Sequence, residues 1–513
     1  MYRLVGAIVG MVALSACVNV PQRSTRANIV DPSTVAVAAS LADVSIDGAG
    51  TSVAWWDDYG DPQLAALIAE AFQASPTLAL ARARLDRALA VAASAKACAM
   101  PLAGVSADIT GQRMTENGMV PPPYAGDWLT NNRLALDFSW EIDFWGKAKA
   151  AIESAKTQAL AAQADAAGAR LVVGVSVARS YTELSHVLTL RELAEQALAN
   201  RREVVQLTKL RRDAGLESEI AVQQALADES SLEVDRLVMV AREEVVRQQL
   251  GVLMGAGPDR GQTVTPPKLR ERALALPSSL PLDLVGRRPD IHAQRFRIQA
   301  SNSEIDVARA QFYPNVDLIG FVGLSSLGLD RLLNAGSTIA GAGPAVRVPL
   351  FGGGRLAANL KGKEADYDLA VAQYNATVLD AVRDVVEQVT TWRAAERQRG
   401  ATDAALDAAL KAYALALRRY EAGLSNYIVV RLSQDRVIAA RQRRADVVAR
   451  QQDASLQLVR ALGGGYRPGD EISGGYSPVN ESSGGYRPDS LPGNPGDDTK
   501  LGSYSQTSSS ITQ

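Results

Sequence analysis

The chain carries the same series of landmarks twice, and this internal repeat limits its fold more than any other feature. The first landmarks recur 213 positions later and the last recurs 208 positions later, in the same order. The pairs are Pro76 with Pro289, Pro101 with Pro314, Trp145-Gly146 with Phe351-Gly352, and Ala214-Gly215-Leu216 with Ala422-Gly423-Leu424. A fixed spacing of this kind indicates two copies of one structural plan.

Within each copy, the period of the apolar residues predicts a helix followed by a pair of strands. Pro76 suits the first turn of a helix that runs to about Ala99, where Pro101 ends it. Five apolar residues then alternate with mostly polar ones, which predicts a strand with one apolar face. They are Leu134, Leu136, Phe138, Trp140 and Ile142. Three further strands are expected at Val105 to Thr110, Val316 to Leu324 and Ala345 to Leu350.

A long helix is expected after each strand pair. From Ala148 to Val173, apolar residues are spaced alternately four and three apart, which is the repeat of supercoiled helices. The first helix is expected to end near Asp213, and the second is expected from Arg355 to about Tyr420. About 66 residues correspond to ~100 Å of helix. Hydrophobic content of 47% with only 5% aromatics is typical of such long packed helices.

The N-terminus has the pattern of a targeting signal. Met1 to Ala16 has a basic start and a short apolar run, as in a secretory signal. Leu14-Ser15-Ala16-Cys17 resembles a bacterial lipobox, so Cys17 is expected to become the lipidated N-terminus, and a plain signal peptide is the alternative. Cys98 is then alone, and an intrachain disulfide is not expected. No mature segment has 18 uncharged apolar residues, so no spanning helix is expected.

Several classes of chemistry lack a sequence signal. The net charge of −2 gives no case for a nucleic-acid partner, and no phosphate-binding G-x-x-x-x-G-K-[ST] motif is present. The two histidines, His186 and His292, are not at metal-ligand spacing. No serine lies in a sequence motif typical of a catalytic nucleophile. We therefore expect no catalytic residue, no metal and no cofactor.

The expected strands point to an assembly in a membrane. Strands of about ten residues with one apolar face suit a membrane β-barrel. Four strands cannot close a barrel, and an open sheet edge is not tolerated in lipid. Several copies of the chain are therefore expected to share one barrel. A water-soluble antiparallel sheet remains the alternative, because alternation alone does not exclude it.

Four stretches resemble the outer membrane factor family, the TolC-like channels, in its lipoprotein efflux branch. They are Trp55-Trp56 to Leu64, Leu284 to Ile291, Ala310 to Pro314, and Ala461 to Tyr466, and the resemblance covers about residues 50 to 466. It implies a mostly α-helical, TolC-like fold. In a homotrimer, three chains share a twelve-stranded β-barrel in the outer membrane and a twelve-helix tunnel through the periplasm. The implied partners are the lipid bilayer, a periplasmic adaptor and an inner-membrane pump, and the implied role is a passive duct, not an enzyme.

The resemblance also implies two kinds of site. Adaptor docking is expected at the helix tips, at Ala214, Gly215, Leu216, Ala422, Gly423 and Leu424. A periplasmic gate is expected from Tyr420, Val429, Arg431, Leu432 and Asp435, to which Arg211, Arg212 and Glu219 of the first copy are candidate partners. Many relatives carry aspartates six and nine residues after the second tip glycine. Here those positions are Val429 and Leu432, which puts the usual acidic ring in doubt.

The expected domain order follows from these features. A signal at 1–16 and a lipidated segment at 17–54 precede the first repeat at 55–258 and the second at 280–465. Gly-Gly-Tyr recurs every ten residues in the tail at 466–513, whose composition predicts disorder. The expected function is export of small molecules from the periplasm. A duct for type I protein secretion and a periplasmic coiled-coil structural or adaptor lipoprotein are the alternatives.

Overall fold

A computed structural model of the chain describes residues 20–36, 54–269, 286–349 and 353–467. The first repeat consists of α2 (Pro62–Ala74), α3 (Pro76–Cys98), β1 (Leu102–Arg113), β2 (Trp128–Glu141), α4 (Lys147–Asp213) and α5 (Glu219–Leu253). The second repeat consists of α7 (Pro289–Ala310), β3 (Asn315–Leu327), β4 (Thr338–Arg347), α8 (Gly353–Glu421) and α9 (Tyr427–Ala461). Cys17, the signal and nearly all of the tail lie outside the described residues. The predicted fold class, long helices with a small four-stranded sheet, is confirmed.

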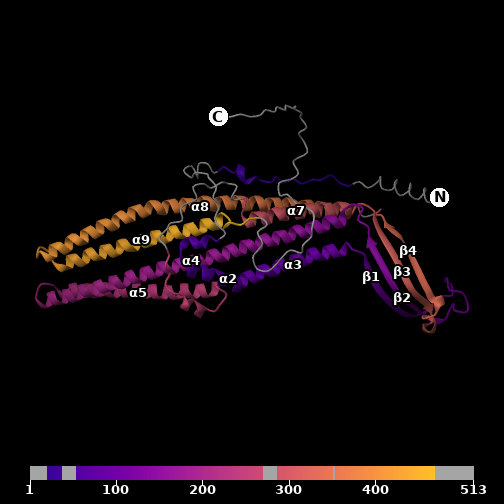
Figure 1. Cartoon of the computed structure of the whole chain (residues 1–513), viewed down its shortest axis with the longest axis horizontal. Coiled ribbons are helices and arrows are strands. Elements are labelled where there is room, and N and C mark those ends of the chain that lie inside the picture. Colours follow the sequence, from indigo (N-terminus) through magenta and orange to yellow (C-terminus); the bar gives the residue numbers. More distant parts are fainter. Residues whose placement is uncertain (1–19, 37–53, 270–285, 350–352, 468–513) are drawn as a thin grey trace, which may run out of the picture. The chain divides into compact units, whose positions relative to one another are not determined.

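The four strands form one antiparallel sheet in the order β1-β2-β3-β4, so β2 and β3 join the two repeats (Figure 1). Leu136 of β2 lies opposite Val105 of β1 and Val322 of β3. The expected fourth strand at Ala345 to Leu350 exists with other bounds, since β4 spans Thr338–Arg347, and Leu350 lies outside the described residues. Its centre, Ala340 to Gly343, consists of alanine and glycine, which give no apolar alternation to detect.

Alternation and register together divide the side chains between two faces of the sheet. We call the first face apolar, and it carries Val105, Ile109, Leu134, Leu136, Phe138, Trp140, Val322 and Val346. The opposite face, which we call polar, carries Ser106, Asp108, Arg133, Asp137, Ser139, Asp317 and Arg347, together with Ile319, Phe321, Ile339 and Gly341. Sequence period and observed pairing agree for Leu134, Leu136, Phe138 and Trp140, whereas Ile142, which was expected in the same strand, follows the end of β2 at Glu141.

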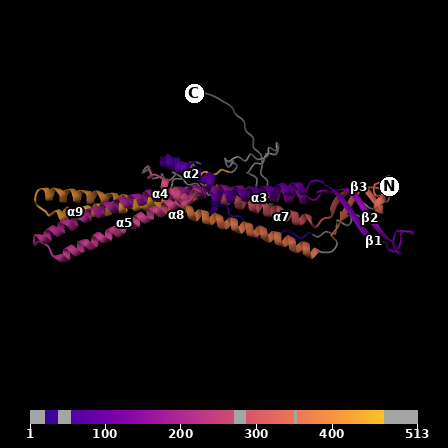
Figure 2. The same ribbon diagram turned by 90° about the horizontal axis from the view of Figure 1, so that it is seen from below.

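The long helices lie beside one another, with α4 at the centre of the contacts. Helix α4 packs against α3, α5, α7 and α9, and α8 packs against α7 and α9. Figures 1 and 2 show the α4–α5 and α8–α9 turns at the ends of the helices remote from the sheet. One buried cluster surrounds Tyr181 and Leu184 of α4, and another surrounds Tyr374 and Val378 of α8. Small seam residues such as Ala155 and Ala159 are buried and allow close helix packing.

One helix also has the length and composition to cross a membrane. Helix α4 contains an 18-residue window with a mean hydropathy of 1.2, of which 39% is buried. Helix α4 contacts five other helices, which are α2, α3, α5, α7 and α9. Apolar windows of this length also occur in the packed central helices of water-soluble proteins.

Candidate functional site

The two hairpin tips share the same cap. At the end of α4 the amide of Leu216 donates to the Arg211 carbonyl at 2.8 Å, and Gly215 has a φ of 70°. At the end of α8 the amide of Leu424 donates to the Arg419 carbonyl at 2.8 Å, and Gly423 has a φ of 72°. These bonds define a Schellman cap, in which glycine supplies the left-handed residue. The predicted chain reversals at both glycines are confirmed.

The side chains beside the two tip glycines are largely exposed. Leu216 is 65% exposed and Leu424 is 70% exposed, and Ala214 and Ala422 are exposed beside them. Helix α5 begins where Ser218 accepts from the Ala221 amide at 3.2 Å. Helix α9 begins where Asn426 accepts from the Ile428 amide at 3.1 Å. Each tip is thus a rigid turn, capped on both sides, that presents one exposed leucine.

Above the second tip, α9 and α4 meet in a polar cluster. Arg431 Nη1 donates to Asn200 Oδ1 at 3.2 Å, and Arg431 also forms an ion pair with Glu203. Asp435 accepts from Asn200 and forms an ion pair with Arg201 Nη2 at 3.1 Å. Asn200 is 2% exposed. The cluster therefore links helices of the two repeats through groups that are charged and largely buried, where ion pairs need several hydrogen bonds to be stable.

The remaining gate candidates lie close to this cluster. The rings of Tyr420 and Tyr427 have centroids 4.8 Å apart, and the Arg431 guanidinium lies 4.7 Å from the centroid of the Tyr427 ring. Val429 and Leu432 do not join the cluster, since their side chains are 47% and 48% exposed. Burial lowers the pKa of Arg431, although nearby Asp435 opposes that shift.

The expected partners from the first repeat pair elsewhere, which corrects that assignment. Arg211 pairs with Glu217 at 3.3 Å, and Arg212 pairs with Glu219 at 2.9 Å, both within the first tip. The four residues that sequence reasoning missed are Asn200, Arg201, Glu203 and Tyr427. Tyr427 had a local signal, because it lies four residues before Arg431 on one helix face. The α4 residues had none, because they meet α9 only through the packing of the two repeats.

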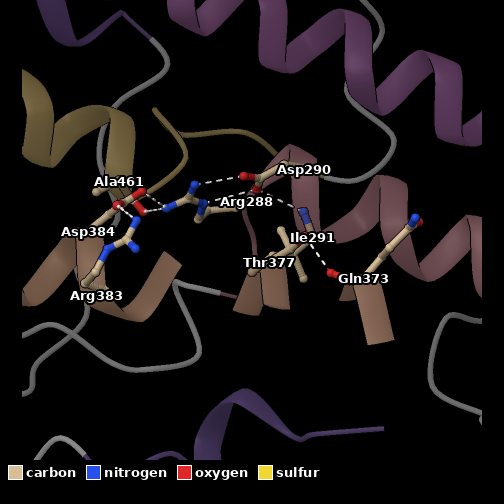
Figure 3. Close-up of polar contacts among 8 residues, drawn as sticks. All are labelled: Arg288, Asp290, Ile291, Gln373, Thr377, Arg383, Asp384 and Ala461. Atoms are coloured by element: carbon tan, nitrogen blue, oxygen red, sulfur yellow. Dashed lines mark hydrogen bonds and ion pairs between the residues drawn. The ribbon is translucent and has the colours of Figure 1, made fainter. Parts of the chain in front are cut away.

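The most family-specific stretch of sequence forms a clamp at the start of α7 (Figure 3). Arg288, which is 8% exposed, pairs with Asp290 at 2.8 Å and with Asp384 of α8 at 3.4 Å. It also donates to the carbonyl of Ala461 at the end of α9, at 3.4 Å. Burial disfavours the charge, but the bonds to Asp290 and Asp384 outweigh it and raise the pKa of Arg288. One guanidinium thus joins three helices of the second repeat.

The last landmark glycine of each repeat packs against the start of the helix that begins at the first proline landmark. That helix is α3 in the first repeat and α7 in the second. A Cβ at Gly255 would lie 2.2 Å from the Ala74 carbonyl oxygen, next to the start of α3. A Cβ at Gly463 would lie 3.2 Å from Arg288 Cα, at the start of α7. Both glycines have positive φ, 76° and 83°. The two repeats therefore close by the same contact, which explains why this glycine keeps its place in both copies.

The described residues 20–36 run along α8 and are held by its side chains. Glu364, Asp368 and Asn375 accept from backbone amides of this segment, and Asn375 donates back to it. The amides belong to Ser24, Arg26, Ala27 and Val30, and the acceptor carbonyl belongs to Asn28. Val20 packs beside a buried cluster that contains Phe312 and Leu356, at the strand end of α7 and α8.

A histidine joins α4 to α9 midway along the helices. His186 Nε2 lies 2.9 Å from Asp446 Oδ1, and Nδ1 lies 3.6 Å from Glu183 Oε2. Arg242 of α5 pairs with the same Glu183. Burial lowers the pKa of His186, but the interactions of its ring with the carboxylates of Glu183 and Asp446 outweigh it, and the net pKa is raised.

The comparisons with known proteins place the chain in one family. The model of the family "Outer membrane efflux protein" matches residues 67–241 and 280–464. The fusaric acid resistance protein FusA of Burkholderia cepacia is 34% identical over 68% of this chain and 66% of its own length. The multidrug resistance outer membrane protein MdtP of Escherichia coli K12 is 30% identical over 81% of this chain and 87% of its own length.

Solved structures agree with the sequence relatives. The outer membrane protein VceC of Vibrio cholerae is 35% identical with a TM-score of 0.74, over 81% of this chain and all of VceC. The outer-membrane channel OprN is 25% identical with a TM-score of 0.74, over 88% of this chain and 99% of OprN. The Campylobacter jejuni CmeC channel, at 19% identity and a TM-score of 0.77, has the same fold. The chain therefore belongs to the outer membrane efflux protein family and is an outer-membrane efflux channel with a TolC-like fold.

Proposed function

We propose that three copies of the chain form one passive duct through the outer membrane, which exports small toxic compounds. In this proposal, a periplasmic adaptor and an inner-membrane pump deliver the compounds to the helix tips. The observation that carries it is the sheet, which has one apolar face and two edges, β1 and β4, that pair with nothing in the described chain.

Unpaired strand edges explain why one chain is not enough. Each edge exposes a row of backbone N–H and C=O groups, and lipid offers them no hydrogen-bond partner. Single-chain bacterial barrels have at least eight strands, so four strands do not close. Three chains give twelve strands, with β4 of each chain beside β1 of the next. This closure leaves no edge exposed and turns the polar face of the sheet towards a common lumen.

The mass of the assembly tests this stoichiometry. The full-length protein, extracted from outer membranes in a mild detergent, is analysed by native mass spectrometry. The expected species has three chains. A species of one or two chains as the largest assembly would contradict the shared barrel.

The cargo is inferred from the names of the relatives. FusA is named for resistance to fusaric acid and MdtP for resistance to many drugs, and both are small-molecule phenotypes. We therefore favour small-molecule export over type I protein secretion. A strain without the gene should accumulate toxic dyes and become more sensitive to them, with its secreted proteins unchanged. Loss of a secreted protein without any change in dye accumulation would favour the secretion alternative.

At the periplasmic end, the tips are the proposed adaptor-docking site, and the polar cluster above the second tip is the proposed gate. Leu216 and Leu424 are exposed on rigid caps, which suits contact with the adaptor. Arg431 and Asp435 connect α9 to α4, so they suit a gate that opens when these helices separate. Because Val429 and Leu432 are exposed and apolar, we propose that they narrow the tunnel without forming an acidic ring.

Lipidation of Cys17 also remains a proposal. Val20 packs near Phe312 and Leu356, next to the strand ends, and Cys17 precedes it by three residues. A lipid on Cys17 would therefore reach the membrane in which the sheet is proposed to lie. Mass spectrometry of the mature N-terminus should show an acylated cysteine, and an unmodified N-terminus at another residue would exclude it.

A further inference from the structure

One aromatic side chain lies on the face of the sheet where polar groups predominate. Phe321 of β3 is 40% exposed on the polar face, between Asp137 of β2 and Gly341 of β4. Lipid is expected on the other face, and Ile319, the nearest apolar side chain of β3 on this face, is itself 46% exposed, so neither lipid contact nor core packing accounts for the ring. Its environment therefore needs a separate explanation.

The ring of Phe321 occupies the space that a side chain at position 341 would need. A Cβ on Gly341 would lie 2.8 Å from Phe321 Cζ and 2.9 Å from Cε1, closer than real Cβ atoms approach carbon. The two residues are direct partners in the β3–β4 register. The far edge of the Phe321 ring thus lies over Gly341. Such cross-strand packing of an aromatic ring on a glycine is a known stabilising device in sheets.

The neighbouring strand holds the ring from its other side. Arg133 of β2 lies with its guanidinium carbon 5.8 Å from the centroid of the Phe321 ring. Arg133 is itself fixed by Asp137 and by Ser106, to which its Nη1 donates at 2.7 Å. A guanidinium near a ring face is attracted to it electrostatically. The ring is therefore bounded by Gly341 and by an anchored arginine.

We propose that the Phe321–Gly341 pair sets the bore of the channel within the outer membrane. The inference rests on the proposed function, in which the polar face of the sheet lines the lumen. The absence of a side chain at position 341 lets each of three rings lie against the wall. A larger residue at position 341 would push the rings into the lumen, because a close-packed ring moves as a rigid body instead of compressing.

The test measures how far polymers can enter the lumen from outside the cell. A thiol is placed by Ser139→Cys on the polar face, two register pairs from Phe321 towards the helices, in a Cys98→Ser background. In the proposed orientation the opposite end of the sheet is extracellular. Intact cells are treated with poly(ethylene glycol) maleimides of increasing length, and the longest polymer that reacts is recorded. Extracellular entry makes the result independent of the periplasmic tips. Only assembled trimers are scored.

The longest polymer that labels the parent protein should label Gly341→Val about tenfold less, because three displaced rings occupy a close-packed lumen wall. A small charged thiol reagent should react equally with both proteins. Gly341→Val combined with Phe321→Ala should restore the parent cut-off. The matched control is Gly343→Val, on the same strand and face, where a Cβ meets nothing within 4 Å. It should leave the cut-off unchanged.

Three outcomes would overturn the proposal. The first is an unchanged polymer cut-off in Gly341→Val, and the second is an equal loss in Gly343→Val, which would show that added volume alone matters. The third is failure of the small reagent as well as every polymer in the parent, which would overturn the inward orientation of the polar face. Where Gly341→Val does not assemble, Gly341→Ala replaces it, because its Cβ alone already overlaps the ring.

Discussion

Arg288 shows how a single buried charge holds the second repeat together. Its guanidinium reaches Asp290, Asp384 and the last turn of α9 (Figure 3). Removal of the guanidinium leaves Asp290 without this partner and Asp384 with only Arg383, although both carboxylates are partly exposed to water. The clamp joins three helices at one point.

We expect Arg288→Gln to destabilise the protein by about 2–3 kcal/mol, the range for hydrogen bonds to charged groups. Arg383→Gln is the control, because Arg383 pairs with the same Asp384 but is 66% exposed, and it should cost less than about 1 kcal/mol. Thermal unfolding in detergent, followed by circular dichroism at one protein concentration, compares the two. Equal midpoints for both variants would show that the clamp is not needed for stability.

His186 should make the α4–α9 contact sensitive to pH. Its pKa is raised in the folded protein, so the protonated form is favoured by folding. The added stability is fully present below the pKa of the unfolded chain and is lost as pH rises through the raised folded pKa. The thermal midpoint should therefore fall more for the wild type than for His186→Gln as pH rises from about 6 to about 8. Parallel curves for the two proteins would exclude His186 as the source.

At the scale of elements, the sequence was most informative where periodicity is long and its ends are marked. The expected helix after Gly146, ending near Asp213, corresponds to α4 at Lys147–Asp213. Glycine and proline mark helix ends because of their backbone restrictions, so they can be read without a structure. The bounds of β4 were not predicted correctly, because its alanines and glycines show no alternation of apolar and polar residues.

The candidate site was only partly predictable for the same reason. Gly215 and Gly423 were identified because helix caps are local. The contacts of Arg431 with Asn200 and Glu203 join positions more than 200 residues apart, and no local pattern encodes which turn of α4 meets α9. Such contacts depend on how the two repeats pack.

The tip caps lead to a prediction about adaptor docking. Gly423→Val should cost about 1–2 kcal/mol of backbone strain, since φ is positive and no neighbour lies within 4 Å of the new Cβ. The trimer should still assemble, but Leu424 should be displaced and cross-linking to the adaptor lost. Gly400→Val within α8, which also meets no neighbour, is the control and should retain docking. Loss of trimer with cross-linking per trimer unchanged would show that the glycine serves folding alone.

The apolar face of the sheet leads to a second prediction at this scale. Phe138→Arg puts a charge among Leu134, Leu136 and Trp140 and should cost about 2–4 kcal/mol near the membrane centre. Ser139→Arg, one residue further along β2 on the polar face, should be tolerated. The amount of assembled protein in outer membranes compares the two variants. Normal assembly of Phe138→Arg with failure of Ser139→Arg would reverse the orientation of the sheet.

At the scale of the whole molecule, the proposed export function requires a continuous water-filled path through the assembly. The TolC-like fold, the apolar sheet face and the unpaired strand edges all follow if the chains surround such a path. A periplasmic coiled-coil lipoprotein would have the long helices but no path for ions. The two accounts therefore differ in electrical conductance.

The most direct test is single-channel recording of the purified full-length protein in planar lipid bilayers, without pump, adaptor or nucleotide. The expected result is discrete, reproducible current steps that scale linearly with small voltages and persist without any energy source. Protein that inserts into the bilayer as an assembled species and yet produces no current steps would contradict the channel account.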